Sequence, residues 1–310
     1  MDQDGTTDRD YHRPVLVDVV VALMQEVLPG TVIDATLGGG GHTRRLIEEY
    51  GDRIRVIAID RDPDAVANAA DLGATVLLGN FADLGDLVSE HLVEPPAAVL
   101  FDFGVSSHQL DEPARGFSYH QDGPLDMRMG PDARLTAAEI VNQWPASAIA
   151  DIIRRQGEEP LASRIADAIV SARPIESTAR LSTVIAEAMP AARRRAGHPA
   201  RRTFQAIRIA VNAELEAVAS GLDQAIELVR PGGRVIAISY HSLEDRIVKT
   251  RFAAGTVGCI CPPGLPVCGC GRTSELRLLT RKPVRASAEE IDQNRRARSA
   301  VLRAVEKVAA

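Results

Sequence analysis

A glycine-rich segment and two acidic residues have the types and the spacing of a binding site for a nucleoside. Asp34 is followed by the run Gly38–Gly41, and Asp60 stands 26 residues after Asp34. Glycines let the backbone approach a ligand closely, and the first N–H groups of a following helix bind an anionic group such as a carboxylate. An acid at the end of the next strand suits the two hydroxyls of a ribose. A tight turn from strand to helix also needs glycine, so the glycines alone leave a purely structural role open.

The order of the glycines favours one class of ligand over another. The fingerprint of dinucleotide-binding proteins has a glycine at its sixth position, where this chain, counted from Gly38, has Thr43. An NAD-dependent dehydrogenase is therefore disfavoured. The pattern favours an adenosine-containing ligand whose tail carries a carboxylate, and S-adenosylmethionine is such a ligand.

Asp102 ends another short apolar run and is the first candidate for catalysis. The exocyclic amine of a nucleobase is a poor nucleophile, and a carboxylate that accepts a hydrogen bond from it stabilises the charge that develops in methyl transfer. The alternatives are that Asp102 orients its loop or binds the amino group of the ligand. Tyr240 is a candidate to contact the substrate base. The next residue, His241, is a second candidate for catalysis through proton transfer, although a single histidine at a strand end is more often structural.

These residues need a sheet to position them, and the sequence predicts one. Five short apolar runs, each followed by a helical or turn pattern, are expected to be strands: Thr31–Asp34, Arg55–Asp60, Ala74–Leu78, Ala97–Asp102 and Arg234–Ser239. Apolar strands that alternate with helices predict an α/β fold with a parallel sheet covered on both faces. The acids then lie at the carboxyl edge of the sheet, where open α/β folds bind ligands.

The alternation stops in the middle of the chain. Between residues 111 and 205 only helical patterns occur, such as Ala146–Gln156 and Leu161–Ala172. We therefore expect a sheet domain made of residues 1–110 and 206–310, interrupted by a helical insertion at 111–205 that recognises the substrate.

Composition narrows the class of protein. The chain of 310 residues is 45% hydrophobic and 25% charged, which is typical of a globular protein and excludes a disordered or fibrous one. No run approaches 18 apolar residues, and the acidic N-terminal segment lacks the features of a signal peptide, so we expect a cytoplasmic protein without a membrane partner. The net charge is −6, but residues 1–130 carry −14 and residues 131–310 carry +8. The second part is therefore suited to a polyanion.

The basic residues gather at one place in this second part. Residues 190–213 contain six arginines and no acid. Arginine is suited to phosphate because its planar side chain binds two oxygens. The candidates to contact a nucleic acid are Arg193, Arg194, Arg195, Arg201 and Arg202. The alternative is an ordinary solvated surface.

All four cysteines lie in the segment 259–270. They are Cys259, Cys261, Cys268 and Cys270, in the pattern C-x-C-x6-C-x-C. Four cysteines in a chain of this length do not make a disulfide framework. Four thiolates suit a structural zinc ion, although the first pair is closer than the usual spacing. A redox-labile loop and a plain loop are the alternatives.

Longer motifs resemble those of one family, the 16S ribosomal RNA cytosine-N4 methyltransferases, also called RsmH or MraW. They are DATLGGGGHT at 34–43, DFGVSSHQLD at 102–111, RGFSYHQDGPLDMRM at 115–129, HPARRTFQAIRIAVNAEL at 198–215 and PGGRVIAISYHSLEDRIVK at 231–249. The resemblance implies a class I, Rossmann-like methyltransferase sheet with an inserted all-helical domain. It also implies methyl transfer from S-adenosylmethionine to the N4 amine of a cytosine in the decoding region of 16S ribosomal RNA. The small ribosomal subunit is then the partner, and ribosome biogenesis the process.

The resemblance also assigns cofactor contacts to positions that match in type. They are Gly40, Gly41, His42, Asp60, Phe81, Asp102 and Gln109. The chain departs from the family pattern at His108 and Arg295, where the family usually has proline. Two other functions stay open, namely amine methylation of another RNA or of DNA, and a nucleic-acid-binding regulator on the same fold. The sequence does not indicate an oligomeric state.

Overall fold

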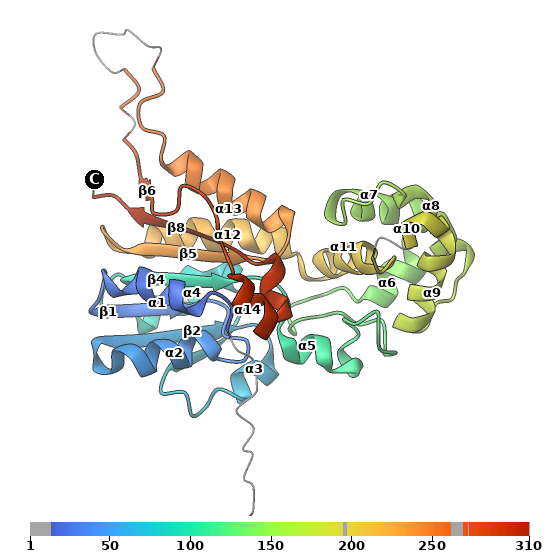
Figure 1. Cartoon of the computed structure of the whole chain (residues 1–310), viewed down its shortest axis with the longest axis horizontal. Coiled ribbons are helices and arrows are strands. Elements are labelled where there is room, and N and C mark those ends of the chain that lie inside the picture. The colour runs from blue at the N-terminus through green and yellow to red at the C-terminus, as the bar shows by residue number, and fades with distance from the viewer. Residues whose placement is uncertain (1–13, 195–196, 262–268, 272, 310) are drawn as a thin grey trace, which may run out of the picture. The chain divides into compact units, whose positions relative to one another are not determined.

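The structure, a computed structural model, describes residues 14–194, 197–261, 269–271 and 273–309, and it divides into two compact units (Figure 1). The sheet unit comprises Met1–Gly104 and Glu216–Ala310, and the helical unit comprises Val105–Leu215. The helical unit is wider than the predicted insertion at 111–205. The reason is that α11, Arg201–Asn212, buries its apolar side chains in the core of the helical unit.

The sheet has eight strands in the order β3-β2-β1-β4-β5-β8-β6, and β7 pairs with β8. The first five are parallel, as the sequence predicts. The C-terminal strand β8 runs antiparallel to β5, β6 and β7. Of these strands only β5 is predicted from the sequence, whereas β6, β7 and β8 are not. The strands are β1 Gly30–Asp34, β2 Ile54–Asp60, β3 Thr75–Leu78, β4 Ala98–Asp102, β5 Arg234–Ser239, β6 Leu276–Leu278, β7 Val284–Arg285 and β8 Val301–Lys307.

Each face of the sheet has its own apolar core, because neighbouring residues of a strand point to opposite faces. Ile33 and Val99 face one layer, which contains α4, α12 and α13. Val32 and Leu100 face the other, which contains α1 and α2. The prediction of a parallel sheet covered on both faces is therefore confirmed for β1–β5, whereas the complete sheet is mixed because β8 is antiparallel to its neighbours. The helices that accompany the sheet are α1 Val17–Gln25, α2 Gly41–Tyr50, α3 Pro63–Ala67, α4 Leu84–Val88, α12 Glu214–Leu228, α13 Ser242–Gly255 and α14 Ala288–Gln293, with 3-10 turns η1 Gly51–Arg53, η2 Phe81–Asp83, η3 Ser89–His91 and η5 Arg295–Ser299.

The helical unit packs short amphipathic helices around a core of its own. In α7, for example, Ile149, Ala150 and Ile153 are buried, which is the three- and four-residue spacing that predicts this helix. The elements are α5 Ser107–Asp111, η4 Pro113–Arg115, α6 Ala137–Gln143, α7 Ala146–Gln156, α8 Ala162–Ser171, α9 Thr178–Ala188, α10 Ala191–Arg194 and α11 Arg201–Asn212. Among all the described residues, no helix is long and apolar enough to cross a membrane.

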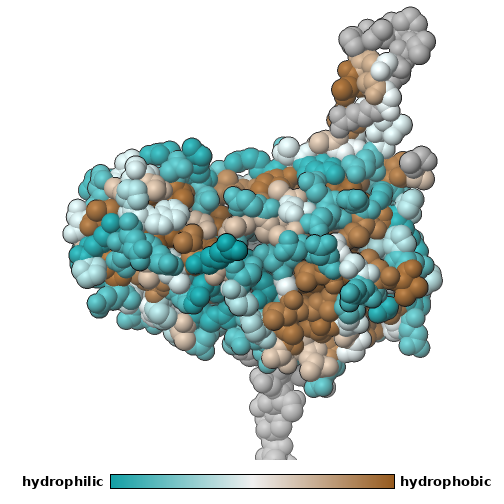
Figure 2. All heavy atoms as spheres, turned by 180° about the vertical axis from the view of Figure 1, so that it is seen from behind, coloured by the Kyte–Doolittle hydropathy of each residue, from teal (hydrophilic) through white to brown (hydrophobic). Residues whose placement is uncertain are grey.

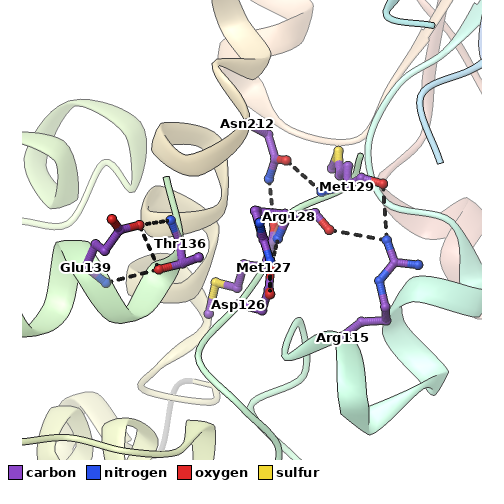
Figure 3. A network of polar contacts seen from close by, with 8 residues as sticks. All are labelled: Arg115, Asp126, Met127, Arg128, Met129, Thr136, Glu139 and Asn212. Atoms are coloured by element: carbon purple, nitrogen blue, oxygen red, sulfur yellow. Dashed lines mark hydrogen bonds and ion pairs between the residues drawn. The ribbon is translucent and has the colours of Figure 1, made fainter. Parts of the chain in front are cut away.

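Polar contacts fasten the long segment before α6 to α11 (Figure 3). The side chain of Asn212, which is 2% exposed, accepts a hydrogen bond from the N–H of Met129 at 2.8 Å and donates one to the carbonyl of Met127 at 2.7 Å. Arg115 donates to the carbonyl oxygens of Arg128 and Met129. A buried amide that satisfies backbone groups in this way fixes a segment that has little regular structure.

Candidate active site

The candidate site lies at the point where the order of the strands reverses. From β1 the chain moves to β2 and β3 on one side, and it returns to β4 on the other side of β1. At such a point the carboxyl ends of neighbouring strands leave a crevice that binds ligands. The residues that end β1, β2 and β4 are Asp34, Asp60 and Asp102. All three predicted acids therefore end strands that are neighbours in the sheet.

The glycine turn after β1 has a backbone that only glycine tolerates easily. The N–H of Leu37 donates to the carbonyl of Ile59 at 2.8 Å, so the turn is held over β2. Gly40 has a φ of +71°, and a Cβ built there would lie 2.6 Å from a methyl carbon of Leu72. Since Gly40 is also the N-cap of α2, it supplies no side chain to the first N–H groups of the helix, which begins at Gly41. These groups are the donors that an anionic ligand would use.

Asp34 holds both ends of this turn through hydrogen bonds. It is 1% exposed, and its two carboxylate oxygens accept hydrogen bonds from the hydroxyl of Thr43 at 2.7 Å and from the N–H of Thr36 at 3.2 Å. Burial raises the pKa of Asp34 above its usual range. The two threonine contacts, which the sequence analysis missed, make Asp34 a residue that positions the glycine turn.

Asp60 is held as an acceptor for further hydrogen bonds. One of its oxygens accepts from the N–H of Gly38 at 2.7 Å, and the other accepts from the N–H of Asp62 at 2.9 Å. Burial raises the pKa of Asp60 to about 6. Each oxygen keeps a second lone pair, which is what two ribose hydroxyls need. Asp62, and not Asp60, caps α3, so a capping role does not account for Asp60.

Each carboxylate oxygen of Asp102 has a contact within the protein, and the side chain is still partly exposed. One carboxylate oxygen accepts a hydrogen bond from the hydroxyl of Tyr240 at 2.8 Å, and the other lies 3.5 Å from Nε2 of His42. The backbone N–H of Asp102 donates to the hydroxyl of Thr36 at 2.6 Å. The side chain is 20% exposed. An acid that is fixed in this way at the edge of a crevice is suited to contact a substrate group.

The two side chains that flank Asp102 respond to its negative charge. Burial lowers the pKa of His42, but the carboxylates of Asp102 and Asp34 outweigh burial, and the pKa lies above its usual value. Nε2 of His42 faces the carboxylate of Asp102, and Nδ1 is buried without a hydrogen bond among the described residues. Burial, followed by the charge of Asp102, raises the pKa of Tyr240 well above its usual range, and its hydroxyl therefore stays a donor.

The other catalytic candidate, His241, has a structural task. It is the N-cap of α13, and its Nδ1 accepts from the N–H of Glu244 at 3.4 Å. The buried carboxylate of Glu244 in turn accepts from the N–H of Tyr240 at 2.8 Å and from that of His241 at 3.3 Å. This capping box holds the turn that presents Tyr240 to Asp102.

Two predicted cofactor contacts lie in different units. Phe81, in the sheet unit, is half-buried, and its ring meets the ring of Phe101 edge-on at 5.6 Å. Gln109, in the helical unit, accepts from the N–H of Ser106 at 3.1 Å in the capping box of α5. Their contacts with a cofactor stay predictions.

The arginine cluster is described only in part. Arg193 and Arg194 belong to α10, but their side chains, and the whole of Arg195, lie outside the described residues. Arg201 is exposed, whereas Arg202 donates to the carbonyl of Glu158 at 2.9 Å. Both arginines line a small open pocket of the helical unit together with Glu159, Met189, Gly197, His198 and Pro199.

An aromatic stack that no local motif predicts lies next to this pocket. The ring of Tyr119 stacks on that of His198 at 4.3 Å and lies 4.4 Å from that of His120. Burial and the nearby His120 lower the pKa of His198, which favours the neutral ring at pH 7. Residues 119 and 198 are far apart in the chain, so only the fold brings them together.

Comparison with known proteins agrees with this geometry. The model of the MraW methylase family matches residues 9–308. The Ribosomal RNA small subunit methyltransferase H of Thermomicrobium roseum is 50% identical over 307 residues, which cover 96% of this chain and 94% of that protein. The protein of the same name from Symbiobacterium thermophilum is 50% identical over 310 residues, covering 97% and 98%. The resemblance found in the motifs is thereby confirmed, and the chain belongs to the MraW methylase family.

Proposed function

We propose that this chain transfers a methyl group from S-adenosylmethionine to the exocyclic N4 amine of a cytosine in the decoding region of 16S ribosomal RNA. The observation that carries the proposal is the set of acids at the reversal of strand order, with Asp60 beside the glycine turn and Asp102 between Tyr240 and His42. The names of the relatives support ribosomal RNA of the small subunit as the substrate. A cytoplasmic location follows from that substrate.

The site has the groups that this cofactor needs. Asp60 has lone pairs for the two ribose hydroxyls, and the first N–H groups of α2 suit the carboxylate of the methionine tail. Nδ1 of His42 makes no hydrogen bond among the described residues. Phe81 offers the exposed part of its ring as an apolar wall for the adenine. When bound, S-adenosylmethionine supplies an electrophilic methyl group together with its own leaving group.

Asp102 is the residue proposed to act on the amine. Its charged carboxylate accepts a hydrogen bond from N4 and stabilises the positive charge that grows on this nitrogen. The amine loses one proton when its new N–C bond forms, and either Asp102 or water takes it. Tyr240 and His42 restrict the carboxylate to one orientation, so little reorganisation is needed during the reaction.

A direct assay tests the proposal. The protein is incubated with tritiated S-adenosylmethionine and with 16S ribosomal RNA, free or in small subunits at several stages of assembly, and the labelled nucleotide is mapped. We expect label on N4 of one cytosine in the decoding region. Label on another RNA or on DNA would favour the first alternative function. Cofactor binding without transfer to any of these substrates would favour a nucleic-acid-binding regulator.

The arginines and the aromatic stack of the helical unit are the proposed RNA contacts. Arg201 is exposed beside the pocket, and the neutral ring of His198 is exposed as a stacking surface for a base. Arg193, Arg194 and Arg195 are proposed as RNA contacts from the sequence alone. Contacts with phosphate position the RNA without reading its sequence. Arg202 is less suited to bind phosphate, because it already donates to the backbone at Glu158 and lies 3.6 Å from the carboxylate of Glu159.

Replacing Arg193, Arg194, Arg195 and Arg201 by glutamine should weaken RNA binding and reduce its dependence on salt. Each lost contact with a single-stranded phosphate lowers the slope of log K against log salt by about 0.7. Arg180→Gln, an exposed arginine on α9, is the matched control and should keep the wild-type slope. Fluorescence anisotropy over a range of salt concentrations gives both slopes. An identical slope for the fourfold variant and the wild type would exclude these arginines as phosphate contacts.

A further inference from the structure

The loop between α13 and β6 brings three thiols together. The Sγ atoms of Cys259, Cys261 and Cys270 all lie within 4.8 Å of one another. Cys259 and Cys270 are exposed and Cys261 is half-buried, so the three are not gathered by packing in an apolar core. The apolar residues of this loop face solvent as well, with Ile260 60% and Val257 45% exposed. Figure 2 shows brown, hydrophobic atoms on the described part of the loop that projects from the molecule. Something other than apolar packing has to explain why the thiols converge.

The distance between two of the sulfur atoms is that of ligands around a shared metal ion. The Sγ atoms of Cys259 and Cys270 are 3.7 Å apart, and in the metal-free protein the thiol of Cys270 donates a hydrogen bond to Cys259. A disulfide bond is about 2.05 Å long. In a tetrahedron with zinc–sulfur bonds of about 2.3 Å, by contrast, neighbouring sulfur atoms are about 3.8 Å apart. The pair is therefore already spaced as one edge of such a tetrahedron.

A backbone N–H also contacts one of the sulfur atoms. The N–H of Cys261 points at Sγ of Cys259 at 3.4 Å. A hydrogen bond of this kind orients a metal-bound group. Several thiolates side by side repel one another unless a cation lies between them, and zinc is the metal typically held by thiolates in tetrahedral sites.

We propose that Cys259, Cys261 and Cys270 bind a structural zinc ion. Cys268 lies outside the described residues, and the proposed ligands are the other three cysteines. On binding, each thiol gives up its proton and the zinc ion keeps its oxidation state, so no oxidant or reductant takes part. The site braces the loop that follows α13 and does not depend on the methyl-transfer reaction.

The metal content of the whole chain tests the proposal. The full-length protein is expressed in zinc-supplemented medium, purified without chelators and under reducing conditions, and analysed by mass spectrometry of its metals. We expect about one zinc ion per chain. Reconstitution of the metal-free protein with cobalt(II) should give the visible absorption of a tetrahedral ion and an intense sulfur-to-cobalt charge-transfer band in the near ultraviolet.

Two variants separate the site from the rest of the loop. Replacement of Cys259, Cys261 and Cys270 by serine should abolish zinc content and the cobalt spectrum, and should make the loop more sensitive to limited proteolysis. Ile260→Ser alters an exposed residue between two of the ligands and should keep both metal and spectrum. Cofactor affinity, measured by calorimetry, reports separately on the site for S-adenosylmethionine.

Three results would overturn the proposal. They are zinc below about a tenth of an equivalent together with no cobalt spectrum, zinc that remains in the triple serine variant, and a mass lower by two hydrogens that reveals a disulfide under the reducing conditions. Failure of methyl transfer with intact zinc would count against the proposed function alone.

Discussion

Asp102→Asn is expected to lower the rate of methyl transfer by about 100- to 1000-fold, which corresponds to about 2.7–4 kcal/mol of lost transition-state stabilisation. Asparagine keeps an oxygen that accepts from the hydroxyl of Tyr240, so the local structure is preserved. It has no charge to stabilise the amine and cannot take its proton. The rate is measured in a single turnover, with enzyme in excess and saturating labelled cofactor, so that product release does not enter.

Matched variants separate this charge from its surroundings. Asp52→Asn removes an exposed acid of the sheet unit and should leave the rate unchanged. Tyr240→Phe removes the hydroxyl that holds Asp102, and one lost hydrogen bond of about 1.4 kcal/mol lowers the rate about tenfold with little change in cofactor affinity. Because Asp102 raises the pKa of His42, Asp102→Asn should also lower this pKa in an NMR titration. A full rate in Asp102→Asn, or a loss explained by weaker cofactor binding alone, would assign catalysis to another group.

The elements that carry these residues were predictable because their signals are local. Strands that are buried on both faces appear in the sequence as apolar runs. Asp34, Asp60 and Asp102 each stand at the end of such a run. The C-terminal strands were not predictable in the same way. In β6 only Leu276 is buried while Arg277 and Leu278 are exposed, and β7 has two residues, so neither forms an apolar run. They become strands by pairing with β8, which is a tertiary effect.

The environment of the acids was less predictable than their position. Asp102 and Tyr240 are separated by 138 residues, and only the pairing of β4 with β5 brings them together. The sequence places His241 at the end of β5, but its role as N-cap depends on Glu244, which is 1% exposed and turned back to the backbone. Residue types alone therefore indicated neither the hydrogen bond from Tyr240 to Asp102 nor the cap that His241 forms on α13. Contact of Tyr240 with the base and proton transfer by His241 stay predictions.

Asp60→Ala is expected to weaken binding of S-adenosylmethionine by roughly tenfold to a hundredfold, because two hydroxyls would lose a charged acceptor worth about 1.5–3 kcal/mol. The side chain also holds the glycine turn through the N–H of Gly38, so part of the loss comes from a less ordered turn. Asp71→Asn, an exposed acid that follows α3, is the control with unchanged affinity. Calorimetry at pH 8 gives both dissociation constants, and wild-type affinity in Asp60→Ala would refute the contact with the ribose.

The raised pKa of Asp60 adds a test in which affinity and stability move in opposite directions. The carboxylate is the acceptor, so the dissociation constant of the wild type should be flat above pH 7 and rise about tenfold per pH unit below about 6, where Asp60 takes up a proton. The stability of the cofactor-free protein should change with pH in the opposite direction. Because the folded-state pKa is raised from 3.8, the contribution of Asp60 to stability is fully present below about pH 4 and is lost as the pH rises through about 6.

His42 and Asp34 also have raised pKa values near this site, so the pH profile of the wild type alone does not isolate Asp60. The difference in cofactor affinity between the wild type and Asp60→Ala isolates Asp60, because both proteins contain His42 and Asp34. We expect this difference in affinity to shrink as the pH falls from 7 to 5, since a protonated Asp60 is no longer a charged acceptor. A difference that stays constant over this range would mean that Asp60 remains ionised there or acts only through the glycine turn.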